Sequence, residues 1–170
     1  AATAPVPAHE APAAIAARLG EAIDVDRYYG WLKTLGLDFG PLFRGVESIR
    51  RGEGEVLARM CWPEGLAPEA GLLWHPACLD ACFHVIGAGL PQQGATLDQA
   101  FLLLQVDRIR LDGAPGRAVW NHVRLRPGEG RDPARAETFS ADLTLLDDAG
   151  AVLARFEGMH FKRARPEALA

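Results

Sequence analysis

The sequence lacks the features that would indicate several common functions. Its 170 residues carry 18 Lys and Arg against 22 Asp and Glu, so it has no basic excess of the kind that favours nucleic-acid binding. No apolar run approaches the roughly 20 residues that span a bilayer. The Ala- and Pro-rich start also lacks the basic and compact apolar regions of a signal peptide. We expect a cytoplasmic protein that binds neither nucleic acid nor membrane.

Cysteine is scarce, and Cys61, Cys78 and Cys82 are the three thiols. An odd number without framework spacing fits a reducing compartment better than secretion. On one helix His75, Cys78 and Cys82 would share a face, and an imidazole with two thiolates suits zinc. Helical cysteines are more often core residues, however, and a Cys78–Cys82 disulfide would pull both side chains out of helical rotamers. We predict no metal site.

Motifs for nucleotide binding or serine hydrolysis are missing as well. No Gly-rich phosphate loop follows a strand, and no Gly-x-Ser-x-Gly is present. Arg108 and Arg110 lie in the segment VDRIRL (106–111) and are most simply the outer face of a strand. The alternative is that they meet an anionic partner.

The residues that are present have the patterning of one folded domain, with 49% hydrophobic residues. Residues 1–13 are dominated by alanine and proline and indicate a linker. The segment DVDRYYGWLKTL (24–35) has apolar residues at helical spacing, with Asp24 or Asp26 as a suitable cap and Gly36 as a suitable stop. The residues that form this apolar face are Tyr28, Trp31, Leu32 and Leu35. The segment VESIRRGEGEVLARMCW (46–62) has two alternating runs around Gly-Glu-Gly, which predicts a hairpin.

A second helix is predicted over residues 75–89, with Pro76 at its first position and glycines at its end. Its apolar residues cover most of the circumference, which is typical of a buried helix. The rest of the chain predicts four strands, at 101–111, 118–126, 138–146 and 152–162. This order of elements indicates an α+β domain in which an antiparallel sheet packs on the central helix.

Asp80 and His84 stand out within this helix because they are the polar residues in the segment CLDACFH (78–84). They are four residues apart, so a helix places them on one face. Apolar neighbours disfavour a charged carboxylate, and a carboxyl that stays protonated near neutral pH can act as a general acid. His84 could hold this carboxyl by a hydrogen bond. On residue types alone, a structural carboxylate beside a core histidine is the simpler interpretation of this pair.

Four stretches, taken in order, resemble one family. They look like the C-terminal half of the dehydratase domain of modular polyketide synthases, and they are GLDFGPLFRG (36–45), HPACLDACFHV (75–85), VDRIRL (106–111) and VLARFEGMHFKRA (152–164). The resemblance implies a hotdog fold, in which an antiparallel β-sheet wraps a long central helix, as one half of a double hotdog. It also implies a linker at 1–22, the C-terminal hotdog at 23–165 and a tail at 166–170.

The resemblance further implies a reaction. The family removes water from a β-hydroxyacyl group carried on the phosphopantetheine of an acyl carrier protein, and it uses no other cofactor. A histidine takes the α-proton, and an aspartic acid, here Asp80, protonates the departing hydroxyl with support from His84. Further site residues implied are Phe39 (where many members carry Tyr), Gly40, Pro41, His75, Pro76 and Leu79.

The family's histidine belongs to a His-x-x-x-Gly-x-x-x-x-Pro motif in the N-terminal hotdog. None of the five histidines fits this motif: His9, His75, His84, His122 and His160. The expected partners are therefore an N-terminal hotdog half that carries the catalytic histidine, an acyl carrier protein, and neighbouring synthase domains in a dimeric parent. The alternatives are a dehydratase-like domain that shifts a double bond or closes a ring, and a non-catalytic structural unit of a megasynthase.

Overall fold

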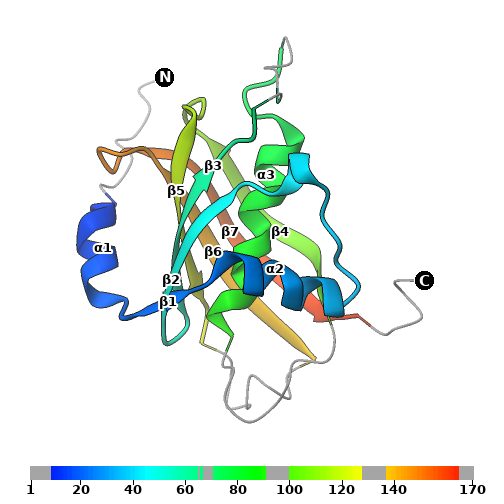
Figure 1. The fold of residues 1–170 in the computed structure, drawn as a ribbon. Coiled ribbons are helices and arrows are strands. Elements are labelled where there is room, and N and C mark those ends of the chain that lie inside the picture. Colours follow the sequence, from blue (N-terminus) through cyan, green and yellow to red (C-terminus); the bar gives the residue numbers. More distant parts are fainter. Residues whose placement is uncertain (1–8, 65, 67–70, 91–99, 128–136, 165–170) are drawn as a thin grey trace.

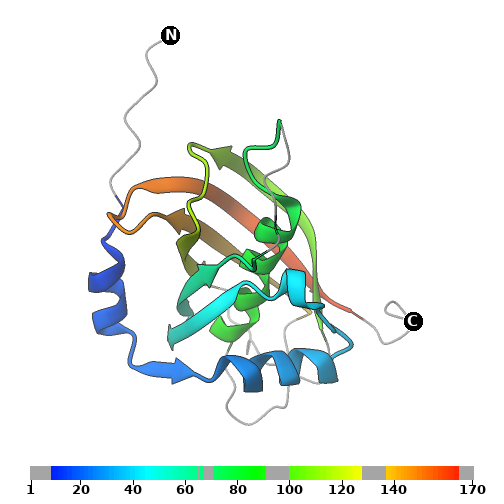
Figure 2. The same ribbon diagram turned by 45° about the horizontal axis from the view of Figure 1, so that its top comes forward.

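An antiparallel sheet curves around the helix α3 (Pro76–His84) in the computed structural model (Figures 1 and 2). The structure describes residues 9–64, 66, 71–90, 100–127 and 137–164. Within these ranges the strand order is β1-β2-β3-β5-β6-β7-β4. The strands are β1 (Glu21–Ile23), β2 (Val46–Gly52), β3 (Glu55–Cys61), β4 (Phe101–Leu111), β5 (Ala118–Leu125), β6 (Thr138–Leu146) and β7 (Val152–Arg163). The predicted fold class, a hotdog unit with a central helix, is confirmed.

The helix α3 is shorter than predicted. It begins where expected, because Pro76 takes the first position and the His75 Nδ1 accepts a hydrogen bond from the Ala77 amide at 3.1 Å. The prediction of one continuous helix to residue 89 is wrong, since the α-helix ends at His84 and a 3₁₀ turn, η2 (Val85–Gly89), follows. The end of an α-helix leaves carbonyl groups without partners in the helix.

Two side chains from other elements bond carbonyls near this helix end. The Asn121 Nδ2 of β5 donates to the Cys82 carbonyl at 2.7 Å, and the Tyr28 hydroxyl donates to the His84 carbonyl at 2.7 Å. Tyr28 belongs to α2 (Val25–Thr34), which Asp24 caps by accepting from the Arg27 amide, as predicted. These bonds fix the end of α3 against both the sheet and α2.

The main core lies between the inner face of the sheet, α2 and α3. The residues that face this core alternate along the strands, as with Val56, Ala58 and Met60 on β3. Each large apolar side chain that is fully buried contributes about 1.5–3 kcal/mol relative to its exposed state. This core holds α3 in one orientation, and therefore decides which of its side chains face outward.

The other face of the sheet carries α1 (Pro12–Arg18), which lies apart from α3 in Figures 1 and 2. Ile15 and Leu19 pack there against Leu57 of β3 and Leu146 of β6. The described part of the segment expected as a linker, residues 9–22, therefore lies on the sheet, and its expected boundary at residue 22 falls inside β1. The remainder of the linker, residues 1–8, and the expected tail at 166–170 lie outside the described residues.

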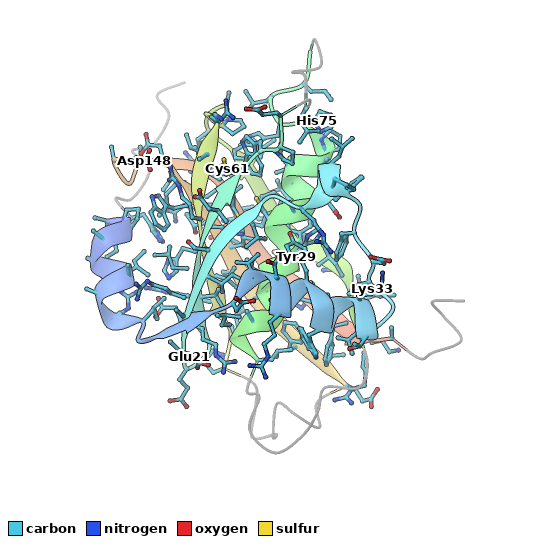
Figure 3. The ribbon with its side chains drawn as sticks, in the orientation of Figure 1. Glu21, Tyr29, Lys33, Cys61, His75 and Asp148 are labelled. Atoms are coloured by element: carbon cyan, nitrogen blue, oxygen red, sulfur yellow. The ribbon has the colours of Figure 1, made fainter. Side chains whose placement is uncertain are left out.

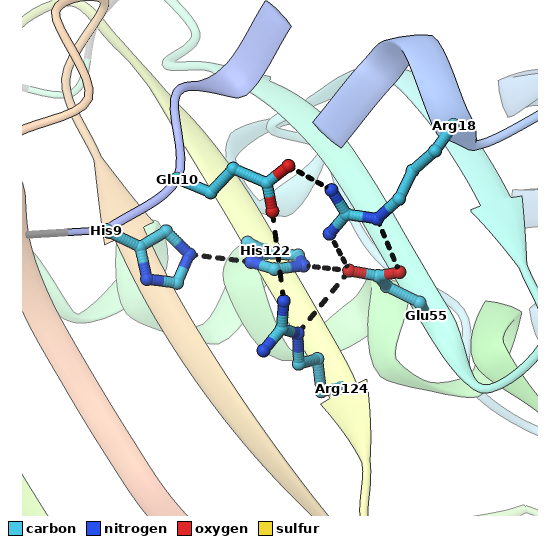
Figure 4. Close-up of polar contacts among 6 residues, drawn as sticks. All are labelled: His9, Glu10, Arg18, Glu55, His122 and Arg124. Atoms are coloured by element: carbon cyan, nitrogen blue, oxygen red, sulfur yellow. Dashed lines mark hydrogen bonds and ion pairs between the residues drawn. The ribbon is translucent and has the colours of Figure 1, made fainter. Parts of the chain in front are cut away.

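A cluster of charged and imidazole side chains ties the start of this segment to the sheet; we call it the outer cluster (Figure 4). The His9 Nε2 lies 2.7 Å from the His122 Nδ1, and the His122 Nε2 lies 2.6 Å from a Glu55 carboxylate oxygen. Arg18 bonds both Glu55, at 2.5 Å, and Glu10. The sixth member is Arg124, 3.4 Å from Glu55.

The strand β4 stands at one end of the strand order and pairs with β7. Within the segment VDRIRL, Ile109 is 56% exposed and Leu111 is 42% exposed, whereas Val106 is partly buried against the core. The Arg108 guanidinium lies 3.6 Å from Glu157, and that of Arg110 lies 2.7 Å from Asp112. Both arginines thus have carboxylate partners within the chain, consistent with the outer face of a strand.

Candidate active site

A cavity of about 250 Å³ opens between α2, α3 and β4. Among the lining residues that the structure describes, Asp80 and His84 are the only ones with ionisable side chains. The remainder are aromatic, aliphatic or glycine: Trp31, Leu32, Leu35, Leu37, Phe39, Phe83, Ile86, Gly87, Leu90, Ala100, Phe101, Leu102, Leu103, Phe139 and Phe161. An apolar cavity with a few convergent polar groups is the usual form of a small-molecule site.

The structure brings Asp80 and His84 together as their spacing predicts. The His84 Nε2 lies 3.0 Å from the Asp80 Oδ2. The side chain of His84 is 4% exposed, whereas that of Asp80 is 48% exposed in this chain. The expectation that Asp80 lies buried among apolar neighbours is therefore wrong, because the core holds the opposite side of α3 against the sheet and leaves the carboxylate at the cavity.

The imidazole of His84 is held by two aromatic residues. Phe39 stacks on it, with ring centroids 3.6 Å apart and an interplanar angle of 28°. The Tyr29 ring meets it edge-on at 6.0 Å, and the Tyr29 hydroxyl lies 3.4 Å from the His84 Nδ1. Both imidazole nitrogens therefore have a partner, and the ring plane has a stacking partner as well.

Tyr29 is the site residue that sequence reasoning missed. The helical pattern placed Tyr28 on the apolar face of α2 and gave Tyr29 no role, yet both tyrosines are buried. Burial raises the pKa of Tyr29 to about 12, so the hydroxyl keeps its proton at neutral pH. The sequence feature that points to Tyr29 is the Tyr-Tyr pair, because a buried tyrosine hydroxyl usually has a hydrogen-bond partner elsewhere in the fold. Figure 3 labels Tyr29 on α2 and His75 at the far end of α3.

The other expected site residues are not among those that line the cavity. Gly40 and Pro41 begin the 3₁₀ turn η1 (Pro41–Phe43), which follows Phe39 directly. His75 and Pro76 begin α3, and the His75 imidazole serves as its cap. Leu79 packs against the core. These residues shape the elements that carry Phe39 and Asp80.

The cysteines of α3 are free thiols. Burial raises the pKa of Cys78 to about 11 and that of Cys82 well above its usual range, so both stay protonated near neutral pH. Metal ligation requires the thiolate. Across the part of the chain that the structure describes, no three His, Cys, Asp or Glu side chains are grouped to hold a metal ion.

Residues 7–170 match the family described as the polyketide synthase dehydratase N-terminal domain. The chain belongs to the polyketide synthase dehydratase family. The spectinabilin polyketide synthase system protein NorA' of Streptomyces orinoci is 31% identical over 147 residues, which is 86% of this chain and 4% of that protein. Polyketide synthase PksN of Bacillus subtilis is 27% identical over 141 residues, 82% of this chain and 2% of that protein.

A solved structure resembles this polyketide synthase dehydratase unit over nearly its whole length. The dehydratase domain from the CurJ module of curacin polyketide synthase matches with a TM-score of 0.80 and 26% identity, and the match covers 96% of this chain and 56% of that one. The chain thus spans a few per cent of its curated relatives and about half of a dehydratase domain. None of its described helices has the length and apolar character needed to cross a membrane.

Proposed function

We propose that this chain is the C-terminal hotdog half of a polyketide synthase dehydratase. The complete domain is a hydro-lyase that converts a β-hydroxyacyl group on an acyl carrier protein into an α,β-unsaturated thioester. One observation carries this proposal: the Asp80 carboxyl lies at an apolar cavity and is held by His84 at 3.0 Å. The family description names an N-terminal domain, so the choice of half rests on the motifs around Phe39 and Asp80.

In the proposed reaction a base removes the α-proton, the bond between the β-carbon and the hydroxyl breaks, and Asp80 protonates the oxygen that leaves as water. The second oxygen of the carboxyl is free for the substrate because His84 engages Oδ2. A positioned general acid accelerates such a step by about 10²–10⁴-fold. An aspartate-to-asparagine mutant of the CurK dehydratase, 25% identical to this chain, is described as inactive.

The cavity suits an apolar acyl chain. Phe139 and Phe161 stack with ring centroids 4.8 Å apart, and Phe101 meets Phe139 edge-on at 4.9 Å. These rings offer apolar surface and no group that would bond a charged substrate. The thioester would arrive on the phosphopantetheine arm of a carrier protein, and we propose no other cofactor.

The base would come from the N-terminal hotdog half. His84 is the one histidine among the described residues that line the cavity, and its Nε2 already faces Asp80. A histidine-to-phenylalanine mutant of the CurJ dehydratase, 25% identical to this chain, is described as inactive. We therefore propose three partners, which are the N-terminal half, an acyl carrier protein and the neighbouring domains of a dimeric synthase. Residues 1–22 would join this chain to the N-terminal half.

The test is Asp80→Asn in the intact protein, supplied with a β-hydroxyacyl carrier-protein substrate and followed by mass spectrometry of the product. We expect the rate of enoyl formation to fall by about 10²–10⁴-fold. The matched control is Asp148→Asn, because Asp148 is an exposed carboxylate on the turn between β6 and β7, far from the cavity. We expect this variant to dehydrate the substrate at the wild-type rate. Unchanged turnover in Asp80→Asn would refute the acid role and favour a structural unit. A shifted alkene or a ring as the wild-type product would favour the alternative chemistries.

A further inference from the structure

The two nitrogens of the His84 imidazole face different partners. Nε2 lies 3.0 Å from the Asp80 Oδ2, and Nδ1 lies 3.4 Å from the Tyr29 hydroxyl. A neutral imidazole carries one proton, so one nitrogen donates a hydrogen bond and the other accepts one. The partner at Nδ1 therefore decides whether Nε2 donates or accepts the hydrogen bond with Asp80.

The Tyr29 hydroxyl is suited to donate. Tyr29 is 3% exposed, and burial raises the pKa of its hydroxyl to about 12, so the hydroxyl remains protonated at neutral pH. The Phe39 ring stacks on the imidazole at 3.6 Å and restricts rotation of the ring out of this arrangement. If Tyr29 donates to Nδ1, the proton of His84 must sit on Nε2, where it points at Asp80.

We propose that Tyr29 is a positioning residue that holds His84 in the Nε2–H tautomer, so that His84 donates to the Asp80 Oδ2 and the acidic proton of Asp80 stays on Oδ1. This inference rests on the proposed role of Asp80 as the acid. In the other tautomer, an unprotonated Nε2 would accept the Asp80 proton and compete with the substrate hydroxyl for it. Tyr29 thus directs the acid toward the cavity without touching the substrate.

The chain offers a matched control in the preceding residue. Tyr28 is also buried on α2, but its hydroxyl donates to the His84 carbonyl and does not bond the imidazole. Tyr28→Phe and Tyr29→Phe each remove one buried hydroxyl next to His84. A general loss of packing or polarity would affect both variants alike, whereas a tautomer effect would appear in Tyr29→Phe alone.

The first measurement is the tautomer of His84, read from ¹⁵N shifts of labelled histidine in the intact protein and assigned by the signals lost in His84→Gln. We expect Nε2–H in the wild type and in Tyr28→Phe, and a substantial Nδ1–H population in Tyr29→Phe. A wild-type tautomer retained in Tyr29→Phe would overturn the inference.

The second measurement is a double-mutant cycle on kcat. We expect Tyr29→Phe to lower kcat about 10-fold when His84 is present and less than about 2-fold in the His84→Gln background, because a glutamine amide has no tautomers. Equal losses in both backgrounds would show a merely structural role and would contradict the inference. Failure of the proposed function is distinguishable, since Asp80→Asn would then retain turnover whatever Tyr29→Phe does to the tautomer.

Discussion

Phe39 lies flat against the imidazole of His84, with ring centroids 3.6 Å apart and an angle of 28° between the planes. The same Phe39 ring meets Tyr29 edge-on at 6.3 Å. The turn before η1, the helix α2 and the helix α3 therefore meet at one imidazole. This contact joins three separate stretches of sequence into one site.

The first prediction concerns this stack. Phe39→Ala removes the aromatic partner of His84, so we expect kcat for dehydration to fall about 10-fold, because the orientation of His84 toward Asp80 is lost. The free energy of unfolding should fall by about 1–3 kcal/mol, less than for a fully buried phenylalanine because Phe39 is only partly buried. Chemical denaturation and steady-state turnover give the two values.

Phe43→Ala is the control for this prediction. Phe43 lies in the adjoining turn η1 and is 42% exposed, so its loss should change stability by no more than about 0.5 kcal/mol. Phe39→Tyr keeps the ring and should turn over like the wild type. If Phe43→Ala lowers kcat as much as Phe39→Ala does, the effect belongs to the turn and not to the stack.

Sequence reasoning reached the Asp80–His84 pair because the pair is local. A spacing of four residues on a helix places the two side chains on one face and within reach of each other. In the structure the His84 Nε2 lies 3.0 Å from the Asp80 Oδ2. Tyr29 lies 55 residues before His84, and its contact depends on how α2 crosses α3. No periodicity within either helix specifies that crossing, so the third member of the site could not be read from the pattern.

The exposure of Asp80 was missed for a related reason. The hydrophobic pattern of α3 indicated burial all round, but burial depends on what covers each face, and the face with Asp80 meets a cavity. The segment at residues 9–22 shows the converse case. Its composition indicated a linker, yet Ile15 is fully buried because the outer face of the sheet supplies an apolar surface.

The second prediction concerns Gly158 in β7. Its φ is +62°, and a Cβ placed there would lie 2.1 Å from the Asp107 Oδ2 and 2.9 Å from the Asp107 Cβ. Gly158→Ala therefore combines a disfavoured backbone conformation with a clash against the neighbouring strand. We expect the free energy of unfolding to fall by about 2–4 kcal/mol in chemical denaturation.

Gly30→Ala should change the free energy of unfolding in the opposite direction. Gly30 lies within α2, is exposed, and has no atom within 4 Å of the position that a Cβ would take. Alanine restricts the unfolded chain and favours the helix, so stability should rise by about 0.5–1 kcal/mol. A loss of stability in both variants, or in neither, would contradict this account of β7.

The last prediction is a loss of stability in acid, caused by the outer cluster. Burial and the charge of His122 lower the pKa of His9 to about 4, and burial also lowers the pKa of His122 against the attraction of Glu55. Burial alone would raise the pKa of Glu55, but hydrogen bonds from Arg18 and His122 outweigh it and lower the value to about 2. Each group therefore binds protons less readily in the folded protein.

The direction of the pH effect on stability follows from these differences in pKa between the folded and the unfolded chain. A histidine with an unfolded pKa near 6.5 and a folded pKa near 4 leaves the unfolded chain with more bound protons between these values, so stability falls as pH falls through that window. Glu55 stabilises the fold above its unfolded pKa of 4.5, and this contribution is lost as pH falls toward about 2. Both effects weaken the attachment of α1 at low pH.

Amide hydrogen exchange at pH 7.5 and pH 5 tests this prediction, with rates corrected for intrinsic exchange. Protection of α1 and β1 should fall about 10-fold at pH 5, whereas β6 and β7 should keep theirs, because α1 is held by the small cluster of Ile15 and Leu19 and by the outer cluster. In His9→Asn the asparagine side chain does not titrate, so the loss of α1 protection between pH 7.5 and pH 5 should be smaller. If α1 loses protection equally in His9→Asn, the acid sensitivity comes from groups other than His9, and the His9–His122 contact does not control the docking of this segment.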